Sequence, residues 1–307
     1  MRDNSLSMKL KGLPGKTFLR LVDLVRGKGL NKIPFFVTVY NKLTCSLRPK
    51  GKFVIPVRGF NMTVIYDEMG VSLLEKGYWE KAETELFESL LTTGMTVVDI
   101  GAHIGYYTLI GAKLVGDNGR VYAFEPQPDN YNILCENIKL NGLSGMVEAV
   151  NKAVCDKTGI LKFWICEEDS INSSLVESNV IFKKRSIEIE TVSLDEYLKG
   201  ITGRIDFLKV DVGGNEGQIL RGASRLLSEK KIKTIFLEYW PEGLKNAGEN
   251  YIELLTNLHK YSYKLIFARD IRDQANLPME IDGSMAIPEF SRVVTDNSIF
   301  NLVFTLE

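Results

Sequence analysis

Histidine is scarce in this sequence: its 307 residues include only His103 and His259. Cysteine is sparse as well, and none of the four cysteines belongs to a Cys-x-x-Cys pair. Zinc sites usually draw three or four ligands from such residues, often as closely spaced pairs. We therefore expect no metal centre and no disulfide framework, only reduced thiols at Cys45, Cys135, Cys155 and Cys166.

Long apolar runs are also absent. The longest one near the start covers residues 33–37, whereas a helix needs roughly 20 apolar residues to cross a bilayer. The first residues are polar and are not followed by the apolar segment of a signal peptide. With 45% hydrophobic and 25% charged residues, the composition is that of a globular protein, and we expect a cytoplasmic location.

Charge is nearly balanced over the whole chain, at −1, but it is unevenly distributed. Residues 1–60 contain 13 lysines and arginines and only two acids, Asp3 and Asp23, so they carry +11 and the remainder carries −12. This asymmetry favours an anionic partner, such as a membrane surface, a nucleic acid or a phosphorylated substrate. Residues 16–26 are weakly amphipathic and could rest on an anionic membrane. Alternatively, residues 1–60 form a cap on the catalytic domain, with their charges in water.

The first part of the chain is predicted to be a small α+β extension. Runs at 52–57 and 62–66 predict a β-hairpin, and residues 79–91 predict a helix. From residue 95, strands alternate with helices, which is typical of a mostly parallel sheet with helices on both faces. We expect strands at 96–100, 120–125, 146–150, 205–211, 234–238, 263–267 and 298–306. Helices are expected at 105–114, 129–140 (capped by Asp129), 216–227 and 249–260. An inserted hairpin is expected at 161–165 and 187–192.

The most informative motif is Asp99-Ile-Gly101-Ala-His103-Ile-Gly105, where a strand ends in an acid and turns through two glycines into a helix. Glycine lets the backbone approach a ligand closely, and ligands of such sheets bind at the carboxyl ends of the strands. The spacing lacks the Gly-x-Gly pair of dinucleotide sites, and the acid would repel a pyrophosphate. A cationic or amino-acid-bearing cofactor fits better. His103 either covers the cofactor, reaches a substrate or merely packs in the loop.

A second acid, Glu125, ends the next strand and is followed by Pro126. A carboxylate here can accept hydrogen bonds from both ribose hydroxyls of an adenosyl group. Either acid alone would be an ordinary solvated strand end. Acids at two successive strand ends favour a cofactor site.

These residues resemble the FkbM family of S-adenosylmethionine-dependent methyltransferases. The resemblance implies a Rossmann-like α/β fold with a seven-stranded sheet, its last strand antiparallel, in a domain covering 78–307 after the basic extension at 1–77. It also implies S-adenosylmethionine as cofactor and methyl transfer, usually to hydroxyl oxygens of sugars, glycolipids or natural products. The matching blocks span 78–240 in the family's order: VVDIGAHIGYYTL at 97–109, AFEP at 123–126, SLD at 193–195, IDFLKVD at 205–211, Glu216, LRG at 220–222 and LE at 237–238.

The resemblance also assigns cofactor contacts to matching positions, to which we add neighbouring residues. The expected cofactor-binding set is Asp99, Gly101, Ala102, His103, Gly105, Glu125, Pro126, Ala153 and Asp211.

One segment departs from the family pattern. After the fourth strand the family usually has Asp-Val-Glu-Gly-Ala-Glu, but this chain has Asp211-Val-Gly213-Gly-Asn215-Glu216. A family carboxylate is therefore missing at Gly213. If that carboxylate takes part in catalysis or binds a metal, this chain has lost it, and a degenerate, non-catalytic cofactor-binding scaffold becomes an alternative.

Methyl transfer from a sulfonium to a hydroxyl requires an aligned acceptor and removal of its proton. Asp211 lies at a strand end, and Lys209 points to the same face because it is two residues back. This pair could orient a hydroxyl and accept its proton, or it could be a structural ion pair. Glu238 and His103 are further catalytic candidates.

The predicted activity is O-methylation of a glycan, lipid-linked or small-molecule hydroxyl. The basic N-terminal segment raises RNA methylation as an alternative, but no recognisable RNA-binding module accompanies it. A nucleic acid is therefore the less favoured partner.

Overall fold

The computed structural model describes residues 51–200, 203–270, 290, 294, 295 and 298–306. The expected amphipathic segment at 16–26 lies outside these residues, as does most of the basic region. Among the described residues, no helix combines the length and apolar character needed to cross a membrane.

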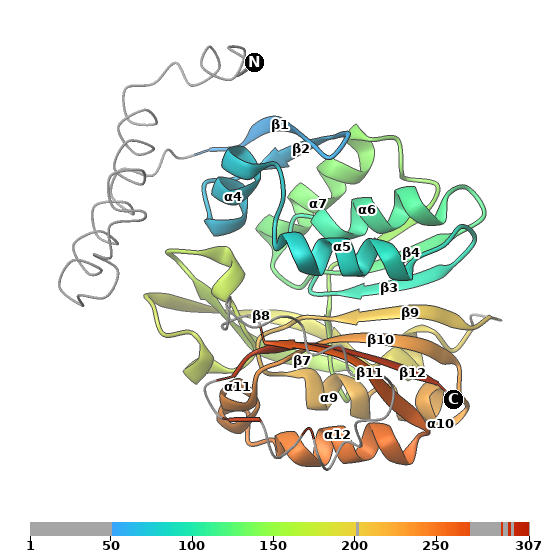
Figure 1. The fold of residues 1–307 in the computed structure, drawn as a ribbon. Helices are drawn as coiled ribbons and strands as arrows, with labels where there is room; N and C mark the ends of the chain where they lie inside the picture. Colours follow the sequence, from blue (N-terminus) through green and yellow to red (C-terminus); the bar gives the residue numbers. More distant parts are fainter. Residues whose placement is uncertain (1–50, 201–202, 271–289, 291–293, 296–297, 307) are drawn as a thin grey trace.

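A seven-stranded sheet forms the centre of the protein (Figure 1). Its spatial order is β11-β12-β10-β9-β3-β4-β5, and every neighbouring pair is parallel except the two made by β12. The predicted fold, with its antiparallel last strand, is therefore confirmed. The strands are β3 (Thr96–Ile100), β4 (Arg120–Phe124), β5 (Val147–Val150), β9 (Ile205–Val210), β10 (Ile232–Tyr239), β11 (Tyr263–Asp270) and β12 (Phe300–Leu306).

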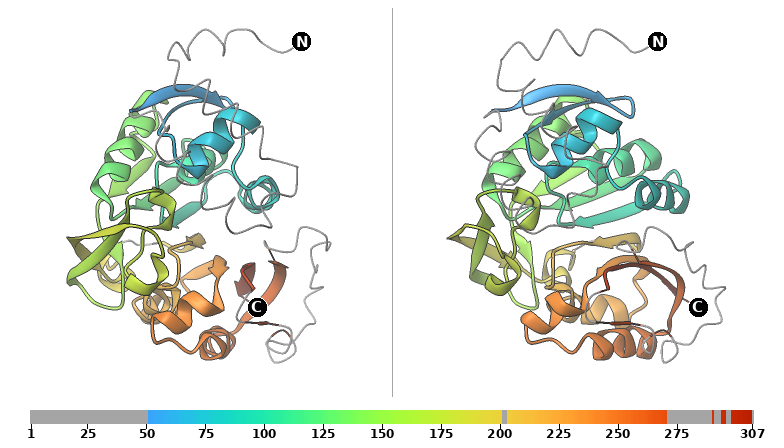
Figure 2. Two further views of the ribbon diagram at one scale, coloured as in Figure 1. Left: turned by 90° about the vertical axis from the view of Figure 1, so that its left-hand side faces the viewer. Right: turned by 60° about the vertical axis from the view of Figure 1, so that its left-hand side comes forward.

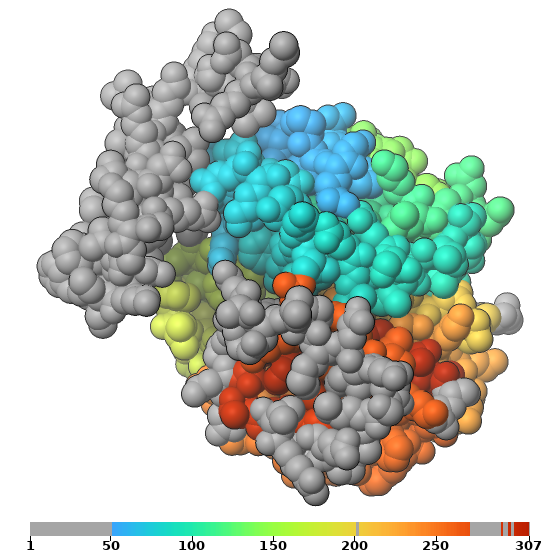
Figure 3. Space-filling view, viewed as in Figure 1, coloured from blue at the N-terminus to red at the C-terminus, as the bar shows by residue number. Residues whose placement is uncertain are grey.

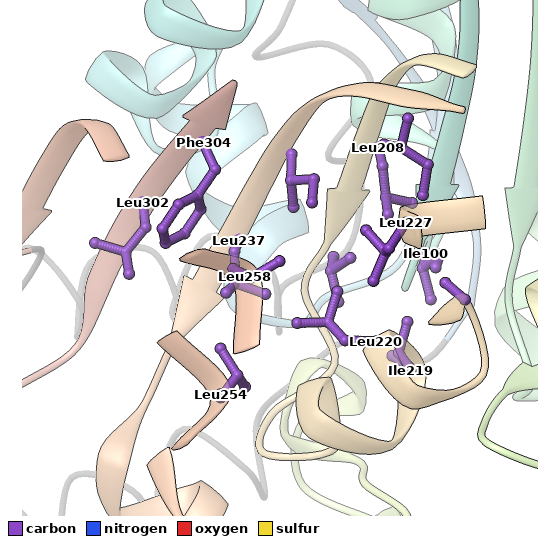
Figure 4. Packing of buried hydrophobic residues seen from close by; sticks show 14 of the residues in the cluster. Ile100, Leu208, Ile219, Leu220, Leu227, Leu237, Leu254, Leu258, Leu302 and Phe304 are labelled. Atoms are coloured by element: carbon purple, nitrogen blue, oxygen red, sulfur yellow. The ribbon is translucent and has the colours of Figure 1, made fainter. Parts of the chain in front are cut away.

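Helices cover both faces of this sheet (Figures 1 and 2). Successive side chains of a strand point to opposite faces, so Val97 packs in one hydrophobic cluster and Val98 in the other. On one face lie α5 (Lys81–Leu90), α6 (Tyr106–Val115) and α7 (Pro128–Leu140). On the other lie α8 (Leu194–Tyr197), α9 (Glu216–Arg221), α10 (Ser224–Ser228), α11 (Pro241–Asn246) and α12 (Tyr251–Lys260). Figure 4 shows part of this second cluster, where Leu220, Leu227 and Leu258 face Leu208, Leu237 and Phe304.

The predicted N-terminal hairpin is confirmed as β1 (Phe53–Val57) and β2 (Phe60–Val64), joined at Arg58 and Gly59, both with positive φ. It is followed by α4 (Glu68–Lys76), which was not predicted, although its Asp67 N-cap and left-handed Gly77 are recognisable helix signals. This described part of the extension shares a hydrophobic cluster with α5, α6 and α7 and forms a continuous surface with them (Figure 3). Asn137 fixes it further by accepting from the Thr63 N–H and donating to the Thr63 carbonyl.

A three-stranded sheet is inserted after β5. It has the order β6-β8-β7, and its long pair is the antiparallel hairpin that the sequence predicts. Two short 3-10 helices, η2 (Ser170–Asn172) and η3 (Glu177–Asn179), occupy its loop. The strands are β6 (Ala153–Val154), β7 (Gly159–Cys166) and β8 (Lys184–Val192).

Two helix predictions were wrong in detail. The helix expected at 216–227 divides into α9 and α10 at Gly222, where a Cβ would lie 2.0 Å from the Cys155 carbonyl oxygen. Asp129 does not cap α7: Gln127 is the N-cap residue, Pro128 occupies the first turn, and Asp129 is already helical. The helix α11 was not predicted.

Candidate active site

The loop after β3 is crowded at its two glycines, Gly101 and Gly105. Gly101 has φ +83°, and a Cβ there would lie 1.9 Å from the Asp211 carbonyl oxygen. Gly105 has φ +95°, and its Cβ would lie 2.7 Å from Leu134. Both positions therefore require glycine for backbone conformation and for space. His103 lies between them at φ +52°, which is uncommon for a residue other than glycine.

Asp99 lies beneath this loop and is almost completely buried. One carboxylate oxygen accepts a 2.6 Å hydrogen bond from the Thr108 hydroxyl, whereas Oδ1 has no partner among the described residues. Burial raises the pKa of Asp99, while the charge of Lys209 and the Thr108 bond oppose the rise. The buried acid thus holds the start of α6 beneath the loop.

Glu125 follows β4 and is also buried. Its carboxylate accepts hydrogen bonds from the backbone N–H groups of His103, at 2.9 Å, and Gln127, at 2.8 Å. Burial raises the pKa of Glu125 to about 7, although these two bonds oppose the rise. The glycine loop and the segment after β4 are therefore joined through one carboxylate.

A small pocket opens beside these two segments. Its walls include Gly101, Pro126 and Ala153, together with Phe163 from the inserted sheet. Asn215 also lines it, is 2% exposed, and has no hydrogen-bond partner for either side-chain polar atom among the described residues. An unpaired buried amide is costly, so the pocket suits a ligand with polar groups to pair with it.

Lys209 and Asp211 form the expected pair at the end of β9. The Lys209 ammonium donates a 2.8 Å hydrogen bond to the Asp211 carboxylate and lies 4.6 Å from the centre of the Tyr107 ring. The lysine is buried, whereas 37% of the Asp211 side chain is exposed. Burial alone would lower the pKa of Lys209, but Asp211 and Asp99 outweigh it and raise the pKa. The lysine is a charged anchor, and Asp211 is the accessible member of the pair.

Two further carboxyl groups interact with this pair. Glu80, the N-cap residue of α5, has φ +40° and accepts a 3.1 Å hydrogen bond from the Tyr107 hydroxyl. Burial, followed by the charge of Asp211, raises the pKa of Glu80 to about 7. Burial and the neighbouring carboxylates raise the pKa of Glu238 well above its ordinary value. A raised pKa means that Glu238 holds its proton to a higher pH than an ordinary carboxyl group does.

His103 connects the glycine loop to the extension and to the inserted sheet. Its Nε2 lies 2.7 Å from the Ser170 hydroxyl, which donates a 2.8 Å bond to Asp67 Oδ2. Because Ser170 donates to Asp67, it accepts from His103, so Nε2 carries the proton. Burial lowers the pKa of His103, and the neutral ring keeps Nδ1 as a buried acceptor without a partner among the described residues.

Comparison with known proteins identifies the family of this chain. A sequence model of the methyltransferase FkbM domain matches residues 99–265. The chain belongs to the FkbM methyltransferase family. It is a methyltransferase, and its methyl donor is S-adenosylmethionine.

Several curated relatives of moderate similarity are methyltransferases. The methyltransferase sdnD of Sordaria araneosa is 29% identical over 186 residues, which is 51% of this chain and 71% of that protein. The hexuronic acid methyltransferase AglP of Haloferax volcanii is 28% identical over 130 residues, 42% of this chain and half of that protein. The crystal structure of M. jannaschii TYW2 in complex with AdoMet aligns with a TM-score of 0.42 and 17% identity, covering 84% of this chain and 88% of that one.

The residues of this FkbM domain fit an adenosyl cofactor. The pocket lined by Gly101, Pro126 and Ala153 lies at the carboxyl ends of β3 and β4. Such a cofactor would lie across these two strand ends. Glu125 could accept from the ribose hydroxyls, and the unpaired Asn215 amide could bind a polar group of the cofactor. When bound, the cofactor supplies a methyl group already activated by a sulfonium.

The departure from the family pattern at Gly213 has a structural counterpart. Gly213 has φ +66° with open space at its Cβ position, and its carbonyl accepts hydrogen bonds from Ser174 and Asn179. The backbone here therefore binds the inserted sheet instead of presenting a carboxylate. Among the described residues there is no cluster of three His, Cys, Asp or Glu side chains able to hold a metal ion.

Several residues of the site were not identified from the sequence. Asp67 and Glu80 precede residues 99–265, which match the family model. Tyr107, Gln127 and Asn130 carry no signal that sets them apart from ordinary helix or loop residues. Ser170, by contrast, belongs to the Ser-Ile-Asn-Ser-Ser loop between the inserted strands, which the sequence marks either as a source of hydroxyl contacts to the substrate or the cofactor or as only a turn. The long separation of these residues along the chain conceals their proximity.

Proposed function

We propose that this FkbM domain transfers a methyl group from S-adenosylmethionine to a hydroxyl oxygen of a glycan, a glycolipid or a small molecule. The observation that carries the proposal is the Lys209–Asp211 pair, in which a buried ammonium holds a partly exposed carboxylate beside the glycine loop. A hydroxyl is a weak nucleophile until its proton is removed, so it requires such a base. The name of the AglP relative, a hexuronic acid methyltransferase, supports a carbohydrate acceptor.

Each side chain has a defined task in this mechanism. Glu125 binds the ribose hydroxyls and thereby sets the position of the methyl group. Lys209 orients the Asp211 carboxylate by its 2.8 Å bond. Asp211 accepts the proton of the acceptor hydroxyl as the new C–O bond forms and the C–S bond breaks. Glu80, with a pKa of about 7, can then take up and release the proton to solvent.

The test is methyl transfer from labelled S-adenosylmethionine to separated cell fractions. Label is expected in an alkali-stable ether of the glycan, glycolipid or small-molecule fraction, and mass spectrometry would identify the methylated oxygen. Asp211→Asn should lower turnover by about 10²–10⁴-fold, the usual contribution of a general base, while binding of S-adenosylhomocysteine remains. Label only in RNA, or a wild-type rate for the mutant, would contradict the proposal.

A further inference from the structure

Three side chains from distant parts of the chain meet in a short chain of hydrogen bonds beside the glycine loop. Asp67 belongs to the N-terminal extension, Ser170 to the loop of the inserted sheet, and His103 to the loop after β3. The Ser170 hydroxyl lies 2.8 Å from Asp67 Oδ2 and 2.7 Å from His103 Nε2. The side chains of Asp67 and His103 are only 3% and 12% exposed, so water has little access to these bonds.

The backbone of His103 needs support from its surroundings. Its φ of +52° lies in the left-handed region, which is unfavourable for a residue that has a Cβ atom. Such conformations persist where neighbouring structure holds them in place. Gly101 and Gly105 adopt positive φ in the same loop without this cost. The hydrogen bond between the His103 ring and Ser170 is therefore a contact that can stabilise the loop.

His103 also connects this hydrogen-bond chain to the proposed cofactor site. Its backbone N–H donates a 2.9 Å hydrogen bond to Glu125 Oε2, and Glu125 is the carboxylate that we propose for the ribose hydroxyls. If the loop shifted, this N–H would turn away from Glu125 and leave its carboxylate less firmly oriented. The ring and the backbone of a single residue thus join the extension and the inserted loop to the binding carboxylate.

The two partners of the ring are themselves fixed in place. Asp67 uses its other oxygen, Oδ1, to cap α4 by accepting a 2.7 Å bond from the Gly70 N–H. Beside Ser170, Asp169 Oδ2 accepts a 3.0 Å bond from the Glu68 N–H at the start of the same helix. Both bonds join the extension to the inserted loop, and together they make a rigid mount for the imidazole ring.

We propose that Asp67 and Ser170 are positioning residues of the cofactor site, which act through His103 to hold the glycine loop in the conformation that binds S-adenosylmethionine. The extension, which precedes the matched residues 99–265, would then be part of the cofactor-binding machinery. This inference rests on the task proposed for Glu125, but it does not depend on the identity of the methyl acceptor.

The first test measures the Kd of the full-length protein for S-adenosylhomocysteine by calorimetry. Ser170→Ala should raise this Kd about 2- to 10-fold, which corresponds to the usual net contribution of one hydrogen bond. Ser173→Ala is the matched control, because it makes the same change in the same loop, where the Ser173 hydroxyl accepts a bond from the Cys166 N–H. This control should bind S-adenosylhomocysteine with the wild-type Kd.

A double-mutant cycle shows whether Ser170 acts through the ring. His103→Gly removes the imidazole and places at this position a residue that adopts positive φ freely. In the His103→Gly protein, Ser170→Ala should therefore change the Kd for S-adenosylhomocysteine by less than about twofold, because the contact that it breaks is already absent.

The protonation of the His103 ring gives a readout that a purely structural role would not change. Burial lowers the pKa of His103, so the ring is neutral and has one ring proton, which the wild type should carry on Nε2. In Asp67→Asn, the new amide nitrogen would donate to Ser170, whose hydroxyl would then donate to Nε2, so the proton should move to Nδ1. The amide oxygen can still accept from Gly70 and cap α4.

Nitrogen-15 NMR of the imidazole rings measures this tautomer directly. The chain contains only two histidines, and the second, His259, is exposed, so the spectrum of His259→Gln assigns the signals of His103.

Four results would overturn the inference. They are a wild-type Kd in Ser170→Ala, an equal loss of affinity in the Ser173→Ala control, an equal effect of Ser170→Ala with and without the His103 ring, and a His103 tautomer that Asp67→Asn does not change. An equal effect without the ring would mean that Ser170 touches the cofactor itself or acts through the general stability of its loop.

Glu125→Gln distinguishes this failure from a failure of the proposed function. If Glu125→Gln binds S-adenosylhomocysteine with the wild-type Kd, the task proposed for Glu125 fails. If Glu125→Gln weakens binding and Ser170→Ala does not, only the positioning role of Ser170 and Asp67 fails.

Discussion

Glu125 offers the sharpest quantitative prediction, because one carboxylate links cofactor affinity to pH. Burial raises its pKa from 4.5 to about 7 in the folded protein. A shift of this size corresponds to roughly 3 kcal/mol of cost for ionising the group in the fold. Because the pKa of Glu125 is higher in the folded than in the unfolded protein, its contribution to the free energy of unfolding is fully present below the unfolded pKa of 4.5. That contribution is lost as pH rises through the folded pKa of about 7. Most of that loss would be complete by about pH 8.

Replacing Glu125 with Gln should remove its share of this pH dependence. In cofactor-free Glu125→Gln, the free energy of unfolding should fall by about 1 kcal/mol less between about pH 6 and pH 8 than it does in the cofactor-free wild type. Glu80 and Glu216, whose pKa values burial also raises to about 7, would retain the rest of the slope. Urea unfolding at several pH values measures the free energy of unfolding. Replacement of the exposed Glu229 by Gln serves as the control.

The same substitution should weaken the cofactor. Charge-assisted bonds from ribose hydroxyls to a carboxylate contribute about 1.5–3 kcal/mol, so the Kd for S-adenosylhomocysteine should rise at least about tenfold in Glu125→Gln. In the wild type the cofactor selects the ionised carboxylate, so binding below about pH 7 should release a proton and weaken as pH falls. Calorimetry in two buffers with different ionisation enthalpies measures both quantities. An unchanged Kd in the folded mutant, or a wild-type Kd independent of pH, would refute the assignment of Glu125 to the ribose.

Three other outcomes are expected. Gly101→Ala should abolish binding of S-adenosylhomocysteine in calorimetry, because its Cβ would lie 1.9 Å from the Asp211 carbonyl; a wild-type Kd would contradict this. Glu80→Gln should remove a kinetic pKa near 7 from the pH profile of kcat, whereas Glu85→Gln on the same helix should leave that profile unchanged. Full-length protein should sediment with anionic but not neutral vesicles, and salt should release it, since residues 1–60 carry +11. Indifference to both vesicles and RNA at low salt would favour the cap interpretation.

Much of the catalytic core was predictable because its signals are local. The strand at Thr96–Ile100 was predicted to the residue, since a short β-rich run ends at a glycine turn. The Lys209–Asp211 pair followed from the two-residue period of a strand, and the pairing is confirmed at 2.8 Å. All the cofactor-binding assignments, Ala153 and Ala102 among them, stay predictions.

The sequence by itself determined the family, the seven strands of the main sheet in their order along the chain, and the acids at the carboxyl ends of β3, β4 and β9, because these depend on residue type and short spacing. Only the tertiary structure decided which distant groups meet at the site. Asp67 and Ser170 lie 103 residues apart yet share a hydrogen bond, and Glu80 accepts from Tyr107, 27 residues away. Tertiary packing also decided protonation, since burial, which no local pattern reveals, raises the pKa of Glu80 and Glu125 to about 7.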